Sequence, residues 1–146
     1  MAVAGQANMA RIISATARRL AGCFFLALYG FRVLAGDVSV EHARFVAERS
    51  GAWSVSVTLR HADAGWKHYA DAWRVAAADG TVFGTRTLYH PHDDEQPFTR
   101  SLNGVNVPEG LSRIFVEAHD KLHGWSPHRL EVDLGKARGE RYEVNR

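Results

Sequence analysis

Residues 90–97 hold the densest group of potential metal ligands in the sequence: His90 and His92 flank a proline, and three carboxylates follow. On an extended backbone, side chains two residues apart point to the same side, about 6.5–7 Å apart along the strand, so both imidazoles can reach one ion. An imidazole-rich set suits borderline metals such as Zn²⁺ or Cu²⁺. The spacing therefore predicts that His90 and His92 bind a divalent transition metal. The plainer interpretation is that they are exposed loop residues, or that hydrogen bonds hold them to Asp93 and Glu95.

Other polar residues could complete or support such a site. The candidates to complete the ligand set are His61, His68, His119 and His123, and those that would orient the ligands or pair with one another are Asp71, Glu95 and Arg100. Asp71 lies between Tyr69 and Trp73 in a strand-like pattern and is expected to face the same way as both, and a half-buried carboxylate needs a partner. A pair of Asp71 with Arg100 or with a histidine would explain it without a metal. Trp66, Tyr69 and Trp73 could line a sugar pocket, although such residues more often cap the core of a sandwich.

The positions of the cysteine and the methionines limit the kinds of metal site that the mature chain can form. The sequence has one cysteine, Cys23, and two methionines, Met1 and Met9, and all three lie in an N-terminal segment that resembles an export signal. The mature chain is therefore expected to contain no thiol and no thioether. This excludes a disulfide framework, a thiolate zinc site and a methionine-rich copper(I) carrier. No phosphate-binding glycine loop or nucleophile motif is apparent, and we expect no organic cofactor.

Residues 1–35 predict a signal peptide. A basic stretch without acidic residues precedes an apolar run over residues 20–31, and small residues then allow cleavage after Ala35. The run is shorter than the roughly 20 residues needed to span a bilayer, so we expect a periplasmic or secreted protein with no membrane contact after cleavage. Alternatives are a lipoprotein box at Cys23, where the apolar residues follow the cysteine instead of preceding it, and twin-arginine export. Met9 is an alternative start.

The charge distribution indicates which kinds of partner the protein is expected to bind. The chain has 18 basic and 16 acidic residues, of which residues 1–35 hold four basic and no acidic ones, so the remainder has 14 against 16 and a net charge of −2. A mildly acidic body is a poor electrostatic match for nucleic acid or anionic lipid. We therefore expect a metal ion or another envelope protein as the partner, and no nucleic acid.

From residue 37 onward the hydrophobic residues follow the period of β-strands. Trp53, Val55, Val57 and Leu59 alternate with polar residues and give the clearest example. Strands are expected over residues 38–48, 53–60, 69–77, 81–89, 98–107, 114–119 and 130–134, with turn signals between them. Seven short strands predict an all-β protein, an antiparallel β-sandwich of immunoglobulin or fibronectin type over residues 36–135. Residues 136–146 are expected to form a charged tail, either frayed or a short extra strand.

This topology predicts where the histidines lie. If each strand reverses the direction of the one before, alternate loops share one end of the sandwich. The second, fourth and sixth loops then meet, and they carry His61 and His68, His90 and His92, and His119, His123 and His128. Loops gathered at one end of such a fold commonly carry its function. The sequence therefore predicts one histidine-rich end as the site.

Two other functions stay open. The protein could be a non-enzymatic interaction module for another envelope protein, with histidines that are merely polar. It could also be a cupin-like metalloenzyme, because Gly84, His90, His92 and Glu95 partly match the first metal motif of cupins. The second cupin motif lacks its histidine after residues 108–110, so we expect a binding protein and not an enzyme.

Several motifs together resemble a known family. They are residues 68–73 (His-Tyr-Ala-Asp-Ala-Trp), 90–92 (His-Pro-His), 95–102 (Glu-Gln-Pro-Phe-Thr-Arg-Ser-Leu), 118–120 (Ala-His-Asp) and 123–124 (His-Gly). This combination is similar to a family of small exported bacterial proteins, and the resemblance covers roughly residues 53–134. It implies export and a compact β domain, and it assigns no activity to any residue.

Overall fold

The computed structural model describes residues 36–146, so the predicted signal peptide over residues 1–35 lies outside the described residues. The described part has nine strands and no helix. The strands are β1 (Ser39–Ala47), β2 (Trp53–Arg60), β3 (Ala70–Ala76), β4 (Val82–Thr87), β5 (Phe98–Val105), β6 (Arg113–Asp120), β7 (Gly124–Trp125), β8 (Leu130–Asp133) and β9 (Tyr142–Asn145). The all-β prediction is therefore confirmed for residues 36–146. Within this range, no segment forms a helix long and apolar enough to cross a bilayer.

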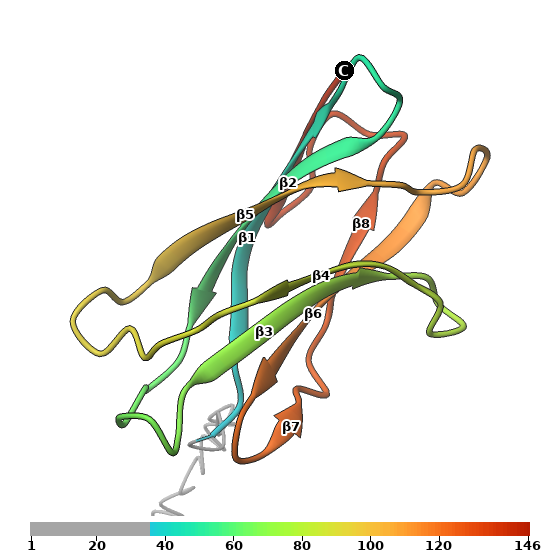
Figure 1. The fold of residues 1–146 in the computed structure, drawn as a ribbon. Coiled ribbons are helices and arrows are strands. Elements are labelled where there is room, and N and C mark those ends of the chain that lie inside the picture. The colour runs from blue at the N-terminus through green and yellow to red at the C-terminus, as the bar shows by residue number, and fades with distance from the viewer. Residues whose placement is uncertain (1–35) are drawn as a thin grey trace, which may run out of the picture. The chain divides into compact units, whose positions relative to one another are not determined.

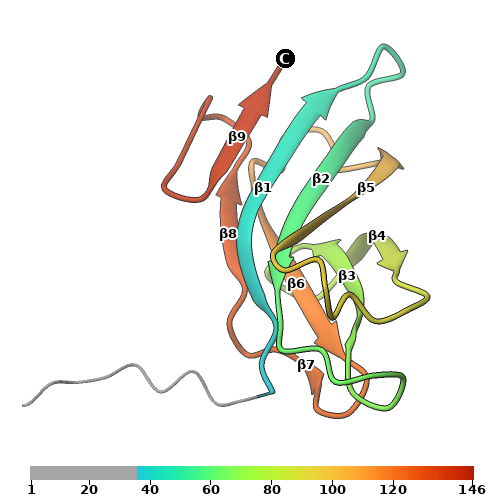
Figure 2. The same cartoon turned by 90° about the vertical axis from the view of Figure 1, so that its left-hand side faces the viewer.

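The strands form two sheets that pack against each other (Figures 1 and 2). One sheet has the order β5-β2-β1-β9, and the other has the order β4-β3-β6-β7, with β8 also paired to β6. Neighbouring strands are antiparallel except β1 and β9, which pair in parallel through Ala43 and Tyr142. Strands β7 and β8 pair with opposite ends of β6, so residues 124–133 run along one edge of that sheet.

The alternation of apolar and polar residues along the central strands explains which side chains form the core. In β2 the side chains of Val55, Val57 and Leu59 are fully buried, while the polar residues between them are partly exposed. Burying each such side chain contributes about 1.5–3 kcal/mol. Trp73 from β3 is also fully buried. The alternation therefore directs one face of each central strand toward the interior between the sheets.

Two strands were less clear from the sequence. In β5, which is an edge strand, Leu102 is only partly buried. Residues 136–146 contain β9, whose Tyr142 and Val144 are buried against the core. Of the two interpretations of this tail, the structure has the short extra strand, which covers the edge of β1 that would otherwise lack a partner.

Three connecting segments, residues 61–69, 88–97 and 121–129, meet beside Asp120 at one end of the molecule, and we call these segments together with Asp120 the histidine pole. The third segment includes β7. In Figure 2 the first and third lie at the bottom of the view. Hydrogen bonds join them directly. The His92 amide donates to Asp63 Oδ2 at 2.6 Å, and the Lys121 amide donates to the Tyr69 carbonyl at 3.0 Å. The antiparallel order of the strands brings these loops together, because each loop follows a strand that runs toward this end.

Candidate metal centre

Asp120 is the central residue of the histidine pole. It is the last residue of β6 and lies on the same side as Ile114, Val116 and Ala118, so its carboxylate points inward and is only 1% exposed. Its Oδ1 accepts a hydrogen bond from the amide of Leu122 at 2.6 Å. That contact begins the loop after β6 and holds the carboxylate in one orientation. Oδ2 is left to face the interior of the pole.

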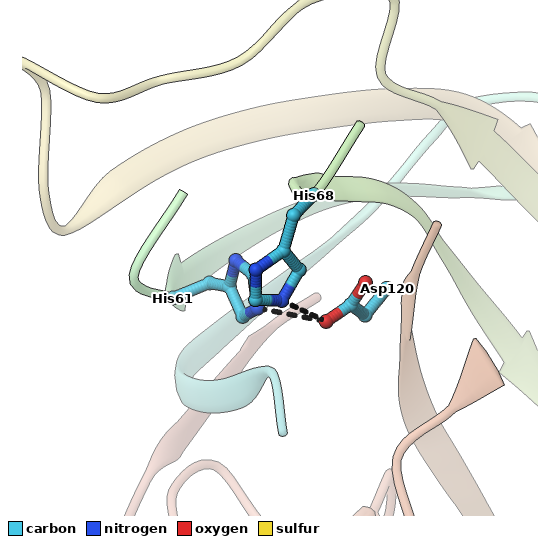
Figure 3. Close-up of side chains that lie close together, drawn as sticks. All are labelled: His61, His68 and Asp120. Carbon is cyan, nitrogen blue, oxygen red and sulfur yellow. Dashed lines mark hydrogen bonds and ion pairs between the residues drawn. The ribbon is translucent and has the colours of Figure 1, made fainter. Parts of the chain in front are cut away.

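Three imidazoles converge on this one oxygen atom. Asp120 Oδ2 lies 3.0 Å from His61 Nε2, 2.9 Å from His68 Nε2 and 2.8 Å from His123 Nδ1. Figure 3 shows His61 and His68 directed at the carboxylate from the loop after β2. The rings of His61 and His68 meet edge to face with centroids 5.0 Å apart, and those of His68 and His123 do so at 4.9 Å. Edge-on packing lets nitrogens of different rings approach a common point.

These atoms could hold a metal ion. The ligand atoms of His61, His68 and Asp120 all lie within 4.8 Å of one another. A tetrahedral ion with bonds of about 2.0–2.1 Å needs ligand atoms roughly 3.3 Å apart, and the two contacts with Asp120 Oδ2, at 3.0 Å and 2.9 Å, would reach this separation by a small outward movement. His61 and Asp120 are buried, whereas 24% of the His68 side chain and 43% of the His123 side chain are exposed. An ion could therefore enter from the side of His68 and His123.

The electrostatics of the pole favour the ionised carboxylate. Burial by itself raises the pKa of Asp120, but hydrogen bonds from His123, from the Leu122 amide and from His68, together with the nearby His61, outweigh burial and lower the pKa to about 2. The Asp120 side chain is therefore an anion at any physiological pH. An anionic oxygen among imidazole nitrogens is a donor set that suits a divalent transition metal.

His90 and His92 do not join the group formed by His61, His68 and Asp120. The His92 ring is 3% exposed and stacks on Phe98, with centroids 3.8 Å apart and planes at 8°. Both of its ring nitrogens are buried without a hydrogen-bond partner among the described residues. His90 is exposed. Residues 88–97 form a loop without strand geometry, because β4 ends at Thr87. The rings of His90 and His92 nevertheless lie near each other, as predicted, with centroids 4.6 Å apart.

The remaining predicted site residues form pairs outside the cluster. His119 Nδ1 lies 2.5 Å from Asp71 Oδ1, and the His119 ring packs edge-on against Trp125. Of the two partners considered for Asp71, the structure has the histidine. Arg100 instead forms an ion pair with Glu95, at 2.8 Å between Nη2 and Oε2. That contact lowers the pKa of Glu95 below its usual range.

Sequence reasoning did not select two buried carboxylates, Asp120 and Asp63. For Asp120 a signal was present: it continues the inward parity of Ile114, Val116 and Ala118, and an inward carboxylate at a strand end needs partners. For Asp63 the sequence had no such signal, because it lies in a loop whose path only the folded chain defines. The cupin-like alternative would have ligands that point into a barrel. Here the candidate ligands lie at the end of two sheets, in two loops and at the end of β6.

The unpartnered His92 leads to a stability prediction. Burial, aided by the charges of Arg100 and His90, lowers the pKa of His92 below 6.5. The unfolded chain therefore binds a proton near pH 6.5 that the folded chain does not, and this contribution to stability is lost as the pH falls below that value. Phenylalanine keeps the stacking and removes both unpartnered nitrogens. Replacing His92→Phe is expected to leave stability unchanged or up to about 1 kcal/mol higher at about pH 8, with a larger advantage at about pH 5.5.

Urea unfolding of the metal-free protein at the two pH values measures this effect. The control is His128→Gln, because His128 is exposed. At each pH its stability should lie within about 0.5 kcal/mol of wild type, as for most surface substitutions. A His92→Phe protein that is less stable than wild type by more than about 1 kcal/mol at both pH values would show that the imidazole has a polar partner in the folded protein.

Part of the chain is similar to a known protein. A segment of 78 residues is 44% identical to part of a protein from Halomicrobium mukohataei named "Putative lipoprotein". This segment covers 53% of the present chain and 38% of that relative, so the chain spans well under half of the relative's length. No protein-family model matches the sequence, and no solved structure matches the fold.

Proposed function

We propose that this chain is an exported β-sandwich protein of immunoglobulin or fibronectin type that binds one divalent transition-metal ion at the histidine pole. The ligands are His61 Nε2, His68 Nε2, His123 Nδ1 and Asp120 Oδ2. One observation carries the proposal: three imidazole nitrogens lie within 3.0 Å of a single buried carboxylate oxygen. These groups satisfy one another by hydrogen bonding in the metal-free protein. Because they already point toward one another, little rearrangement is needed for an ion to replace the imidazole protons that face the carboxylate.

The donor set favours Zn²⁺ or Cu²⁺. Imidazole suits both ions, and the sequence from residue 36 onward contains no cysteine or methionine that would favour Cu⁺. The supports for export are the features of residues 1–35 and the name of the Halomicrobium relative. The strand order supports the sandwich type, because β5-β2-β1 and β4-β3-β6-β8 reproduce the two-sheet arrangement of fibronectin-like domains.

Calorimetric titration of the purified protein with Zn²⁺ and Cu²⁺, together with elemental analysis, tests the proposal. We expect one ion per chain, no binding in a His61→Gln/His68→Gln variant, and wild-type affinity in a His90→Gln/His92→Phe variant. The two double variants remove the same number of imidazoles from neighbouring loops, so a difference between them locates the ion. Loss of binding only in the second variant would move the site to the His90 loop, and absence of stoichiometric binding to wild type would refute the proposal.

A second candidate is a protein-interaction module of the cell envelope. Four large hydrophobic side chains of the histidine pole are exposed: Trp66 (65%), Tyr89 (74%), Leu122 (63%) and Trp125 (38%). Exposed hydrophobic side chains that form one patch are typical of an interaction surface, and these four lie in the three segments of one pole. Partner binding that persists with a chelator and is lost in Trp66→Ser/Leu122→Ser would favour this function over metal binding.

A further inference from the structure

Asp63 is a fully buried carboxylate beside the proposed metal ligands. Its side chain has no exposed surface, and it lies two residues after His61 in the loop between β2 and β3. Asp63 Oδ1 lies 2.6 Å from His61 Nδ1 and also accepts the amide of Ala70 at 3.0 Å. Asp63 Oδ2 accepts the amide of His92 at 2.6 Å. One side chain therefore connects His61, the start of β3 and the loop that carries His90 and His92.

These contacts determine which nitrogen of His61 can bind a metal. An ionised carboxylate only accepts hydrogen bonds, so Asp63 Oδ1 requires a proton on His61 Nδ1. Nε2, on the other side of the ring, lies 3.0 Å from Asp120 Oδ2 and donates to that oxygen in the metal-free protein. A bound ion would take the place of this second proton, which makes Nε2 the ligand while Nδ1–H still donates to Asp63. Metal-bound histidines commonly donate their second N–H to a carboxylate, which fixes the ring and raises its basicity as a ligand.

We infer that Asp63 is a positioning residue for the metal site: it holds His61 as the Nδ1–H tautomer with Nε2 toward the ion. Through the His92 amide the same carboxylate ties the His90–His92 loop to the site. That loop thus supports the ion through its backbone and not through its imidazoles. This inference rests on the proposed metal-binding function, because it assigns a role to Asp63 only if His61 Nε2 is a ligand.

Long-range ¹H–¹⁵N NMR of the Zn²⁺-loaded wild-type protein tests the tautomer without any substitution. We expect His61 to carry its proton on Nδ1 and to have a metal-shifted Nε2 resonance. A His61 proton on Nε2, or Zn²⁺ bound through Nδ1, would overturn the inference. Failure of the wild-type protein to bind Zn²⁺ would instead refute the proposed function itself, so the two failures are distinguishable.

Substitution measures the size of the effect. An Asp63→Asn variant is expected to bind Zn²⁺ about 10–100-fold more weakly, because an amide cannot accept from both His61 and His92. Asp63→Glu, which keeps the charge, should recover part of the affinity. The matched control is Asp93→Asn: Asp93 is an exposed acceptor of the Gly65 amide at 3.4 Å in the same pole, and its loss should leave affinity unchanged.

Affinity of folded Asp63→Asn within about threefold of wild type would contradict the positioning role. If circular dichroism shows that Asp63→Asn does not fold, the tautomer of His61 in the wild-type protein decides the question. Loss of Zn²⁺ affinity in Asp63→Asn together with a change of the His61 tautomer would support the positioning role, because a purely structural role of Asp63 would not move the proton between the ring nitrogens of His61.

Discussion

Replacing Asp120→Asn is expected to lower the affinity for Zn²⁺ by about 10²–10³-fold, equivalent to roughly 3–4 kcal/mol. Asparagine has nearly the same shape, and its carbonyl can still accept the amide of Leu122, so the turn after β6 should persist. The variant lacks the negative charge that faces His61, His68 and His123. Those imidazoles would then bind a dication without the anion that offsets its charge. Calorimetric titration at one pH measures the difference.

Asp71→Asn is the matched control for this experiment. Asp71 is also a carboxylate paired with a histidine, His119, but it lies outside the cluster of His61, His68 and Asp120. Its substitution should leave the affinity for Zn²⁺ within about threefold of wild type. An Asp120→Asn protein that binds as tightly as Asp71→Asn would remove Asp120 from the ligand set.

Zn²⁺ at about 100 times its dissociation constant is expected to raise the free energy of unfolding by about 2.7 kcal/mol, because the ion binds only the folded chain. For a domain of this size, that corresponds to a rise of about 10 °C in the melting temperature. The expected site joins the loop after β2 to the end of β6, which are 59 residues apart in sequence at His61 and Asp120. The unfolded chain does not preserve that arrangement.

Thermal unfolding with Zn²⁺, with Mg²⁺ and after addition of a chelator measures this stabilisation. Mg²⁺ should have no effect, since it prefers oxygen ligands in octahedral geometry. The chelator should return the melting temperature to that of the metal-free protein. A His61→Gln/His68→Gln variant should show no shift with Zn²⁺, and a shift of wild-type size in this variant would place the stabilising ion elsewhere.

Much of the fold could be predicted from the sequence because strand periodicity is a local property. Residues 53–60 alternate between apolar and polar side chains, and the same residues form β2 with its apolar face buried. The edges were harder to predict. The parallel pairing of β9 with β1 depends on which strand edge is left open after the sheets have formed, and no local pattern carries that information.

The position of the candidate site in the fold could be predicted from the sequence, whereas the residues that form it could not. Antiparallel alternation was enough to place three histidine-bearing loops at one end. It could not show that the His92 ring would stack on Phe98, or that His119 would pair with Asp71 on the outer face of its sheet. The first outcome depends on the path of an irregular loop, where neighbouring residues no longer alternate between two sides. The second depends on the register between β3 and β6, which shifts between Ala70 and Ala72.

The sequence by itself therefore determined an all-β chain with its histidines concentrated in alternate loops, since hydrophobic period and strand reversal follow from residue order. Only the tertiary structure decided that His61, His68 and His123 face Asp120 and that Asp63 connects His61 to the His90–His92 loop. The physical reason is that a ligand set needs atoms within a few ångströms of one point. Such proximity arises between residues distant in sequence only after both sheets have packed.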